Sequence, residues 1–117
     1  MLTVVELIEQ IRPSVNEVSV ADFKKRLKQA GALLIDIREP NEFAAGAIEG
    51  AINIPRGILE SQITALCQKI SVTAPADVDI LIYCRSGARG VLAAESLQRM
   101  GYNHVVNLIG GIVAWQQ

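Results

Sequence analysis

The sequence predicts an α/β fold in one domain, built on a mostly parallel sheet with helices on both of its faces. Three observations lead to this expectation. The chain has 117 residues, a length that fits one domain. Its composition, 50% apolar and 20% charged, is that of a globular protein and excludes a disordered chain. Apolar runs alternate with helical patterns through short connections, which favours right-handed crossovers and about five strands.

The first forty residues hold two helical patterns. Apolar side chains at helical spacing predict a helix within residues 2–12, which Pro13 should end because the residue before a proline avoids the helical region. This helix either packs on the core or docks a second subunit, so a monomer and a homodimer both stay open. Ser19 has the features of an N-cap for a second helix, and Gly31 those of its stop.

The middle of the chain continues the alternation. Residues 32–37 form an apolar run that predicts a strand buried on both faces. Pro40 suits the first turn of a short helix through Phe43, because proline is tolerated there. Residues 51–54 predict a short strand and residues 58–70 an amphipathic helix. Cys67 lies beside the apolar stripe of that helix, where we expect a buried small hydrophobe.

The last third predicts two more strands and one helix. Residues 79–84 form the second buried strand, and a glycine-containing turn leads into a helix over about 88–100. Gly101 is the expected stop of this helix. Residues 105–108 form a final strand, followed by a short tail in which Trp115 should pack over the end of the sheet.

Charge and residue counts exclude several classes of protein. Eleven basic against twelve acidic residues give a net charge of -1, too little for a general nucleic-acid binder or a polybasic membrane-surface protein. No apolar run approaches the ~20 residues of a membrane span, and the first residues do not resemble a signal peptide, so we expect a cytoplasmic protein. Two cysteines make no disulfide scaffold, and a single histidine, His104, which we expect at the surface, provides no zinc cluster.

Cys84 is the strongest candidate for chemistry. It ends the strand at 79–84, at the edge where open α/β sheets bind ligands. The next residues turn directly into a helix, so their N–H groups should converge on the sulfur and the helix N-terminus should add positive charge. Such surroundings stabilise a thiolate, which we expect to be open to attack. The residues predicted to surround it and to bind substrate are Arg85, Ser86, Gly87, Ala88, Arg89 and Gly90.

The spacing of this loop separates two kinds of cysteine enzyme. A protein phosphatase loop has a histidine before the cysteine and five residues between the cysteine and an arginine. Here Tyr83 precedes Cys84, and only four residues separate Cys84 from Arg89. The shorter loop makes a tighter cradle, which suits one sulfur atom on the cysteine better than a tetrahedral phosphate.

The sequence resembles the rhodanese (thiosulfate sulfurtransferase) family in four stretches that occur in the family's order. These stretches are LIDIREPNEF at 34–43, GAIEGAINIP at 46–55, YCRSGAR at 83–89 and GGIVAW at 110–115. The resemblance covers about residues 17–117, which we take as the domain, and leaves 1–16 as an N-terminal helical extension. Ala47 and Glu49 replace the usual His and Pro. Gly90 replaces a common Ser or Thr and is expected to loosen the start of its helix.

The resemblance implies a mechanism. The Cys84 thiolate would attack the sulfane sulfur of a small anionic donor such as thiosulfate, sulfite would leave, and a Cys84 persulfide would remain. Cyanide, a cellular thiol or a protein thiol would then take the sulfur. The loop N–H groups from Arg85 to Gly90 would hold the terminal sulfur, and Arg85 and Arg89 would attract the donor. No metal or organic cofactor is implied.

Charged residues outside the loop have weaker assignments. Asp36 ends its strand at the same edge of the sheet, where it either orients an arginine of the loop or caps the next turn. Arg38 is a candidate to support the site, and its spacing from Glu42 predicts an ion pair between the two. Arg56 either lines the mouth of the pocket or is a solvated loop residue.

Two other functions stay open. A phosphatase or arsenate reductase would use the same thiolate, against the spacing of the loop. A non-catalytic or carrier module would act through protein partners, with residues 2–12 as its contact surface.

Overall fold

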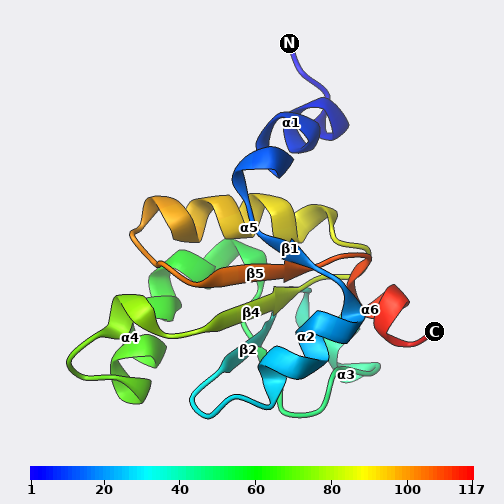
Figure 1. Cartoon of the computed structure of the whole chain (residues 1–117). Coiled ribbons are helices and arrows are strands. Elements are labelled where there is room, and N and C mark those ends of the chain that lie inside the picture. The colour runs from blue at the N-terminus through cyan, green and yellow to red at the C-terminus, as the bar shows by residue number, and fades with distance from the viewer.

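The computed structural model describes residues 1–117 and contains one five-stranded sheet in which every pairing is parallel. Its strand order is β1-β5-β4-β2-β3 (Figure 1). The strands are β1 (Glu17–Val18), β2 (Leu33–Asp36), β3 (Ile52–Asn53), β4 (Ile80–Tyr83) and β5 (Val105–Leu108). The helices are α1 (Val4–Ile11), α2 (Val20–Leu27), α3 (Pro40–Ala44), α4 (Leu59–Ile70), α5 (Ala88–Arg99) and α6 (Gly111–Trp115). Short 3-10 turns cover Arg12–Ser14, Arg56–Ile58 and Pro75–Asp77.

The two central strands confirm the predicted α/β fold. Every residue of β2 and β4 is buried, because helices cover both faces of the sheet at these strands. The register aligns Ile35 with Ile82, and Ile82 with Asn107. Since successive side chains point to opposite faces, these three residues share one face of the sheet.

Two apolar layers hold the helices on the sheet. Residues of α4 and α5, with Ile8 of α1, pack against one face in a cluster of 19 buried residues. On the other face, Phe23 of α2 and Ile112 of α6 belong to a cluster of eight. Trp115 packs edge-on against the ring of Phe23 at a centroid distance of 6.2 Å, which agrees with its predicted position over the sheet.

Three local expectations need correction. The helix predicted to stop at Gly31 ends at Leu27, and Gly31 instead takes its positive φ of 81° in the turn before β2. The strand β1 was not expected, because two residues are too few for a periodic pattern. The tail after β5 folds into α6, whose N-cap is Gly110 in the left-handed region. Gly101 does follow α5 with φ 100°, as predicted.

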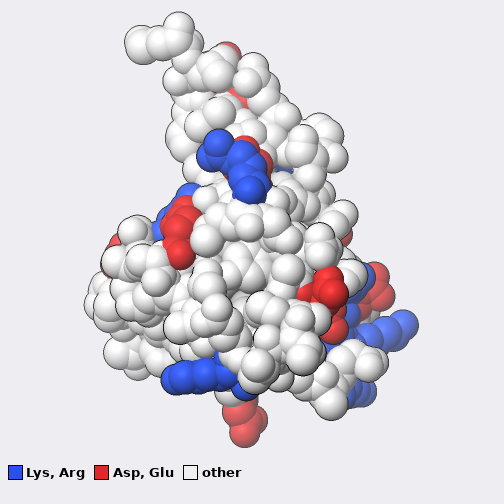
Figure 2. Space-filling view, turned by 90° about the vertical axis from the view of Figure 1, so that its left-hand side faces the viewer, with Lys and Arg blue, Asp and Glu red and all other residues white.

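The N-terminal helix α1 lies against α5 and stands out from the body of the molecule (Figure 1). Its only buried residue is Ile8, while Val4 and Val5 are more than half exposed. Figure 2 shows the side of the molecule where the strands begin, and charges of both signs are scattered over it without a large patch of either. No helix is long and apolar enough to cross a membrane. The cytoplasmic location and the oligomeric state stay predictions.

Candidate active site

Cys84 follows β4 directly, at the carboxyl edge of the sheet. The backbone N–H of Gly87 donates a hydrogen bond to its Sγ over 3.1 Å. The residue is only 1% exposed, because its strand side packs into the core and the loop folds back over it. The expectation of a sulfur open to solvent is therefore wrong for this conformation, whereas the amide of Gly87 does face the sulfur.

The loop after Cys84 is rich in unpaired donors. Gly87 is the N-cap of α5 and has φ 103°, a conformation that L side chains rarely adopt. Five more backbone N–H groups of this segment donate to no protein acceptor: those of Arg85, Ser86, Ala88, Arg89 and Gly90. Together with the N-terminus of α5 they form a concentration of positive partial charge beside the sulfur, suited to an anion.

The glycine pair at the start of α6 lets that helix approach the loop. The N–H of Ile112 donates to the Cys84 carbonyl over 2.9 Å, and the N–H of Val113 donates to the Arg85 carbonyl over 3.1 Å. A Cβ on Gly111 would lie 2.5 Å from backbone atoms of Cys84 and Arg85. The terminal Gly-Gly motif is thus explained by the close contact between α6 and the loop.

Arg89 pairs with Glu42, the acid for which the sequence predicted a pair with Arg38. Its guanidinium makes two hydrogen bonds to the Glu42 carboxylate of α3, over 2.9 and 3.0 Å. This pair lowers the pKa of Glu42 to about 2 and raises that of Arg89, to which the nearby Cys84 contributes a smaller part. The predicted pair between Arg38 and Glu42 is therefore wrong, because the loop arginine competes successfully for that carboxylate.

Arg38 turns instead toward Asp36. The guanidinium contacts the Asp36 carboxylate over 2.7 and 3.1 Å and donates to the Gly46 carbonyl over 2.7 Å. Asp36 also accepts from the backbone N–H of Arg38, so it does cap the turn after its strand. The arginine that it orients is Arg38 rather than one of the Cys84 loop. Hydrogen bonding to Asp36 raises the pKa of Arg38, whose guanidinium carbon lies 5.8 Å from the ring centre of Tyr83.

A shallow hollow of about 360 Å³ opens beside these groups. Arg85 lines it, is exposed and makes no ion pair, so it carries the free positive charge of the site. Arg56 does not line the hollow and pairs with Glu60 over 2.8 Å. The residues around the hollow are Arg38, Glu42, Ala45, Gly46, Arg85, Ile112, Val113 and Gln116.

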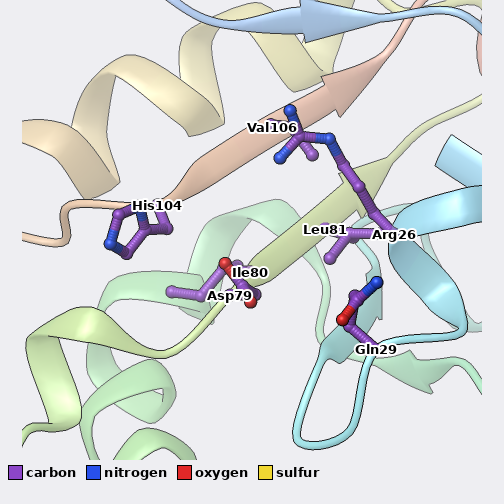
Figure 3. A pocket seen from close by; sticks show the side chains of 7 residues that line it. All are labelled: Arg26, Gln29, Asp79, Ile80, Leu81, His104 and Val106. Carbon is purple, nitrogen blue, oxygen red and sulfur yellow. The ribbon is translucent and has the colours of Figure 1, made fainter. Parts of the chain in front are cut away.

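A second hollow lies at the opposite edge of the sheet and holds no cysteine. Figure 3 shows Arg26 and Gln29 from the α2 region facing the start of β4 and β5, around a space of about 90 Å³. His104 stands at its rim and is exposed, as predicted. This edge carries the amino ends of the strands, where open α/β sheets rarely bind ligands.

Asn107 is a buried polar residue that the sequence analysis did not single out. Its Nδ2 donates to the Gly87 carbonyl over 3.0 Å and to Glu17 Oε2 over 3.1 Å. The sequence feature that could have identified this residue is its polar side chain inside the otherwise apolar strand 105–108. Gly90 belongs with it, because a Cβ there would lie 1.9 Å from Asn107 Oδ1. The glycine makes room for this amide, which accounts for its departure from the usual Ser or Thr.

Known proteins resemble this arrangement over most of the chain. The sequence profile of the rhodanese-like domain family matches residues 19–117. A sulfurtransferase of Allochromatium vinosum is 39% identical over 102 residues, which cover 86% of this chain and 88% of the relative. The human thiosulfate:glutathione sulfurtransferase is 33% identical over 104 residues, which cover 84% of this chain and 90% of the relative.

A solved structure shares the fold over nearly the whole chain. A protein of unknown function from Rhodopseudomonas palustris, described as a possible tyrosine phosphatase, superposes with a TM-score of 0.83 at 28% identity, over 99% of this chain and 90% of its own. The sulfurtransferase relatives support sulfur transfer as the general activity. With its five parallel strands, its cysteine loop and a profile match to residues 19–117, the chain belongs to the rhodanese-like domain family.

Proposed function

We propose that this protein is a thiosulfate sulfurtransferase that carries sulfur as a persulfide on Cys84. The observation that carries the proposal is the hydrogen bond from the Gly87 N–H to Sγ, at 3.1 Å, with five unpaired N–H groups in the same loop. An N–H group that faces the sulfur stabilises the thiolate, and the unpaired N–H groups beside it can hold the outer sulfur of a persulfide.

The reaction has two steps. The Cys84 thiolate attacks the sulfane sulfur of thiosulfate, the sulfur–sulfur bond of the donor breaks, and its electron pair leaves on sulfite. Cyanide or a thiolate then attacks the outer sulfur of the persulfide, which gives thiocyanate or a new persulfide and returns the Cys84 thiolate. No net oxidant or reductant is needed.

Two arginines of the loop have different roles in this proposal. Arg85 lines the hollow without an ion pair, so it attracts the anionic donor and stabilises the departing sulfite. Arg89 is neutralised by Glu42 and ties the loop to α3. Because Cys84 is 1% exposed, attack also requires the loop over the sulfur to move aside.

The experiment is intact mass spectrometry after incubation with thiosulfate. We expect the protein to gain one sulfur atom, and cyanide to remove it with formation of thiocyanate. Cys84→Ser should gain none. Cys67→Ser should behave like the wild type, because Cys67 lies on α4 away from the loop and burial raises the pKa of its thiol. A Cys84→Ser protein with full thiosulfate:cyanide activity would reject the mechanism.

A phosphatase is the second candidate, because the neighbour from Rhodopseudomonas palustris is described as a possible tyrosine phosphatase. The four residues between Cys84 and Arg89 and the pairing of Arg89 with Glu42 disfavour it. Hydrolysis of an aryl phosphate by a preparation that forms no persulfide would reverse this ranking. A protein that forms the persulfide but transfers it only to a partner protein would support the carrier function.

A further inference from the structure

A continuous series of hydrogen bonds leads from the N-terminal segment to the sulfur of Cys84. Arg12, at the end of α1, donates to Glu17 Oε1 over 2.7 Å, and Asn107 donates to Glu17 Oε2 over 3.1 Å. The same Nδ2 of Asn107 donates to the Gly87 carbonyl over 3.0 Å. Gly87 in turn donates its N–H to the Cys84 sulfur over 3.1 Å. Residues that are 72 positions apart, Arg12 and Cys84, are therefore joined through three side chains or peptide groups.

The surroundings of Asn107 fix the orientation of its amide. Two oxygen acceptors, one from Glu17 and one from Gly87, lie on the same side, so only the nitrogen can face them. The oxygen Oδ1 is left against Gly90 with no hydrogen-bond partner, although the residue is fully buried. An unpaired buried oxygen is costly, and a leucine would fill this space without it. The two hydrogen bonds that the Asn107 amide donates are thus the reason for an asparagine at this position.

The peptide geometry shows what these bonds control. The Gly87 carbonyl and the Ala88 N–H belong to one planar peptide group and point in opposite directions. Holding this carbonyl at β5 therefore directs the Ala88 N–H away from β5. The preceding peptide carries the Gly87 N–H that contacts the sulfur. The Gly87 carbonyl also accepts a hydrogen bond from the Val91 N–H of α5 over 3.3 Å, so the helix holds it on one side. Since glycine at φ 103° rotates easily, the shorter bond from Asn107 adds the contact that fixes this peptide against β5.

We infer that Asn107 is a positioning residue for the Cys84 loop, held in place by Glu17 and Arg12. This inference rests on the proposed function only in taking Cys84 as the reacting group. The segment before the domain thereby contributes to the reactivity of the site through Arg12, in addition to the packing of Ile8. Glu17 is well placed for this task, because its side chain is only 12% exposed and its two oxygens serve the two neighbours separately.

The test measures the reactivity of Cys84 rather than the stability of the fold. Iodoacetamide modification of Cys84 is followed by peptide mass spectrometry across pH, for the wild type and Asn107→Leu. We expect modification at neutral pH to slow about tenfold and the midpoint of the pH profile to rise. Without Asn107 the Gly87 peptides are held less firmly, and the hydrogen bond from the Gly87 N–H to the sulfur is lost. The matched control is Asn103→Leu, because Asn103 lies just before the same strand and bonds Asp77, away from the loop. It should leave the profile unchanged.

A second pair of variants keeps the inference testable if Asn107→Leu fails to fold. Glu17→Ala removes the acceptor that orients the amide and should slow modification about threefold, as a part of one hydrogen bond predicts. Glu17→Gln keeps one oxygen that can accept from Asn107 but loses the ion pair with Arg12, so it should restore part of the rate. Unchanged Cys84 profiles in Asn107→Leu and Glu17→Ala, with only the unfolding midpoint lowered, would show a purely structural role and overturn the inference.

The same experiment separates this inference from the proposed function. If the wild type forms no persulfide with thiosulfate while Asn107→Leu still shifts the modification profile, the positioning role stands and the proposed reaction is wrong. If the wild type forms the persulfide and the profile does not move, the reaction stands and the positioning role is wrong.

Discussion

Replacing Gly90 with alanine tests the closest packing contact described above, and its sign is the informative quantity. Gly90 lies in the first turn of α5 with an ordinary helical backbone, so helix propensity alone predicts that Gly90→Ala stabilises the protein by about 1 kcal/mol. The added Cβ would stand 1.9 Å from Oδ1 and 2.6 Å from Cγ of Asn107. No side chain tolerates such an approach, so Asn107 must move.

The cost of that movement exceeds the gain in propensity. Overpacking in a well-packed interior costs about 1–3 kcal/mol. Displacing Asn107 also weakens its two hydrogen bonds, to Gly87 and Glu17, at about 1 kcal/mol each. We therefore expect Gly90→Ala to lower the free energy of unfolding by about 2–4 kcal/mol.

Urea denaturation followed by circular dichroism measures this difference, and a double-mutant cycle assigns its cause. In an Asn107→Ala background the clashing atoms are absent, so Gly90→Ala should there be neutral or stabilising by about 1 kcal/mol. If Gly90→Ala stabilises the wild-type protein, or destabilises both backgrounds equally, the contact with Asn107 does not explain the glycine and the reasoning fails.

Three further changes have expected outcomes. The pair with Arg89 lowers the pKa of Glu42 from its ordinary 4.5 to about 2 in the folded protein. Its contribution to stability is therefore complete above pH 4.5 and is lost as the pH falls from 4.5 toward 2. Between pH 7 and pH 3, urea unfolding should show a loss in the free energy of unfolding that is about 1 kcal/mol smaller in Glu42→Gln than in the wild type. This figure is reduced because the pair is partly exposed to solvent. Asp36→Leu leaves the buried Arg38 unpaired and should cost about 3–5 kcal/mol, seen as a lower thermal midpoint; a loss below about 1 kcal/mol would contradict the pairing. Gly111→Ala, at φ 59° and 2.5 Å from backbone, should cost about 3 kcal/mol or more, whereas Gly57→Ala, with nothing within 4 Å, serves as the neutral control.

Patterns with a local physical cause were predictable from the sequence. The apolar runs at 32–37 and 79–84 predicted two buried strands, and β2 and β4 lie within these ranges. Ser19 accepts a hydrogen bond from the Asp22 N–H as an N-cap should, and Cys67 is a fully buried hydrophobe. Burial raises the pKa of that thiol. In each case the preference depends on residues within one element.

Features that depend on distant partners could not be predicted in this way. Arg38 and Glu42 are four positions apart, yet Arg38 binds Asp36, two residues before it, because Glu42 binds Arg89, which the fold brings from α5. Competition for a carboxylate is decided by three-dimensional position, which helical spacing does not contain. The hydrogen bonds of Asn107 to Gly87 and Glu17 likewise join three segments, and only the polar residue inside an apolar strand hinted at them.

The carbonyls of Cys84 and Arg85 are held by the N–H groups of Ile112 and Val113, more than twenty-five residues along the chain. The loop can therefore take its shape only after β5 and α6 have docked on the sheet. Until that moment a newly made or partly unfolded molecule exposes an ordinary thiol without converging amides. The hydrogen bond from the Gly87 N–H to the sulfur is therefore a property of the complete fold, and local opening of α6 would weaken it before the sheet itself unfolds.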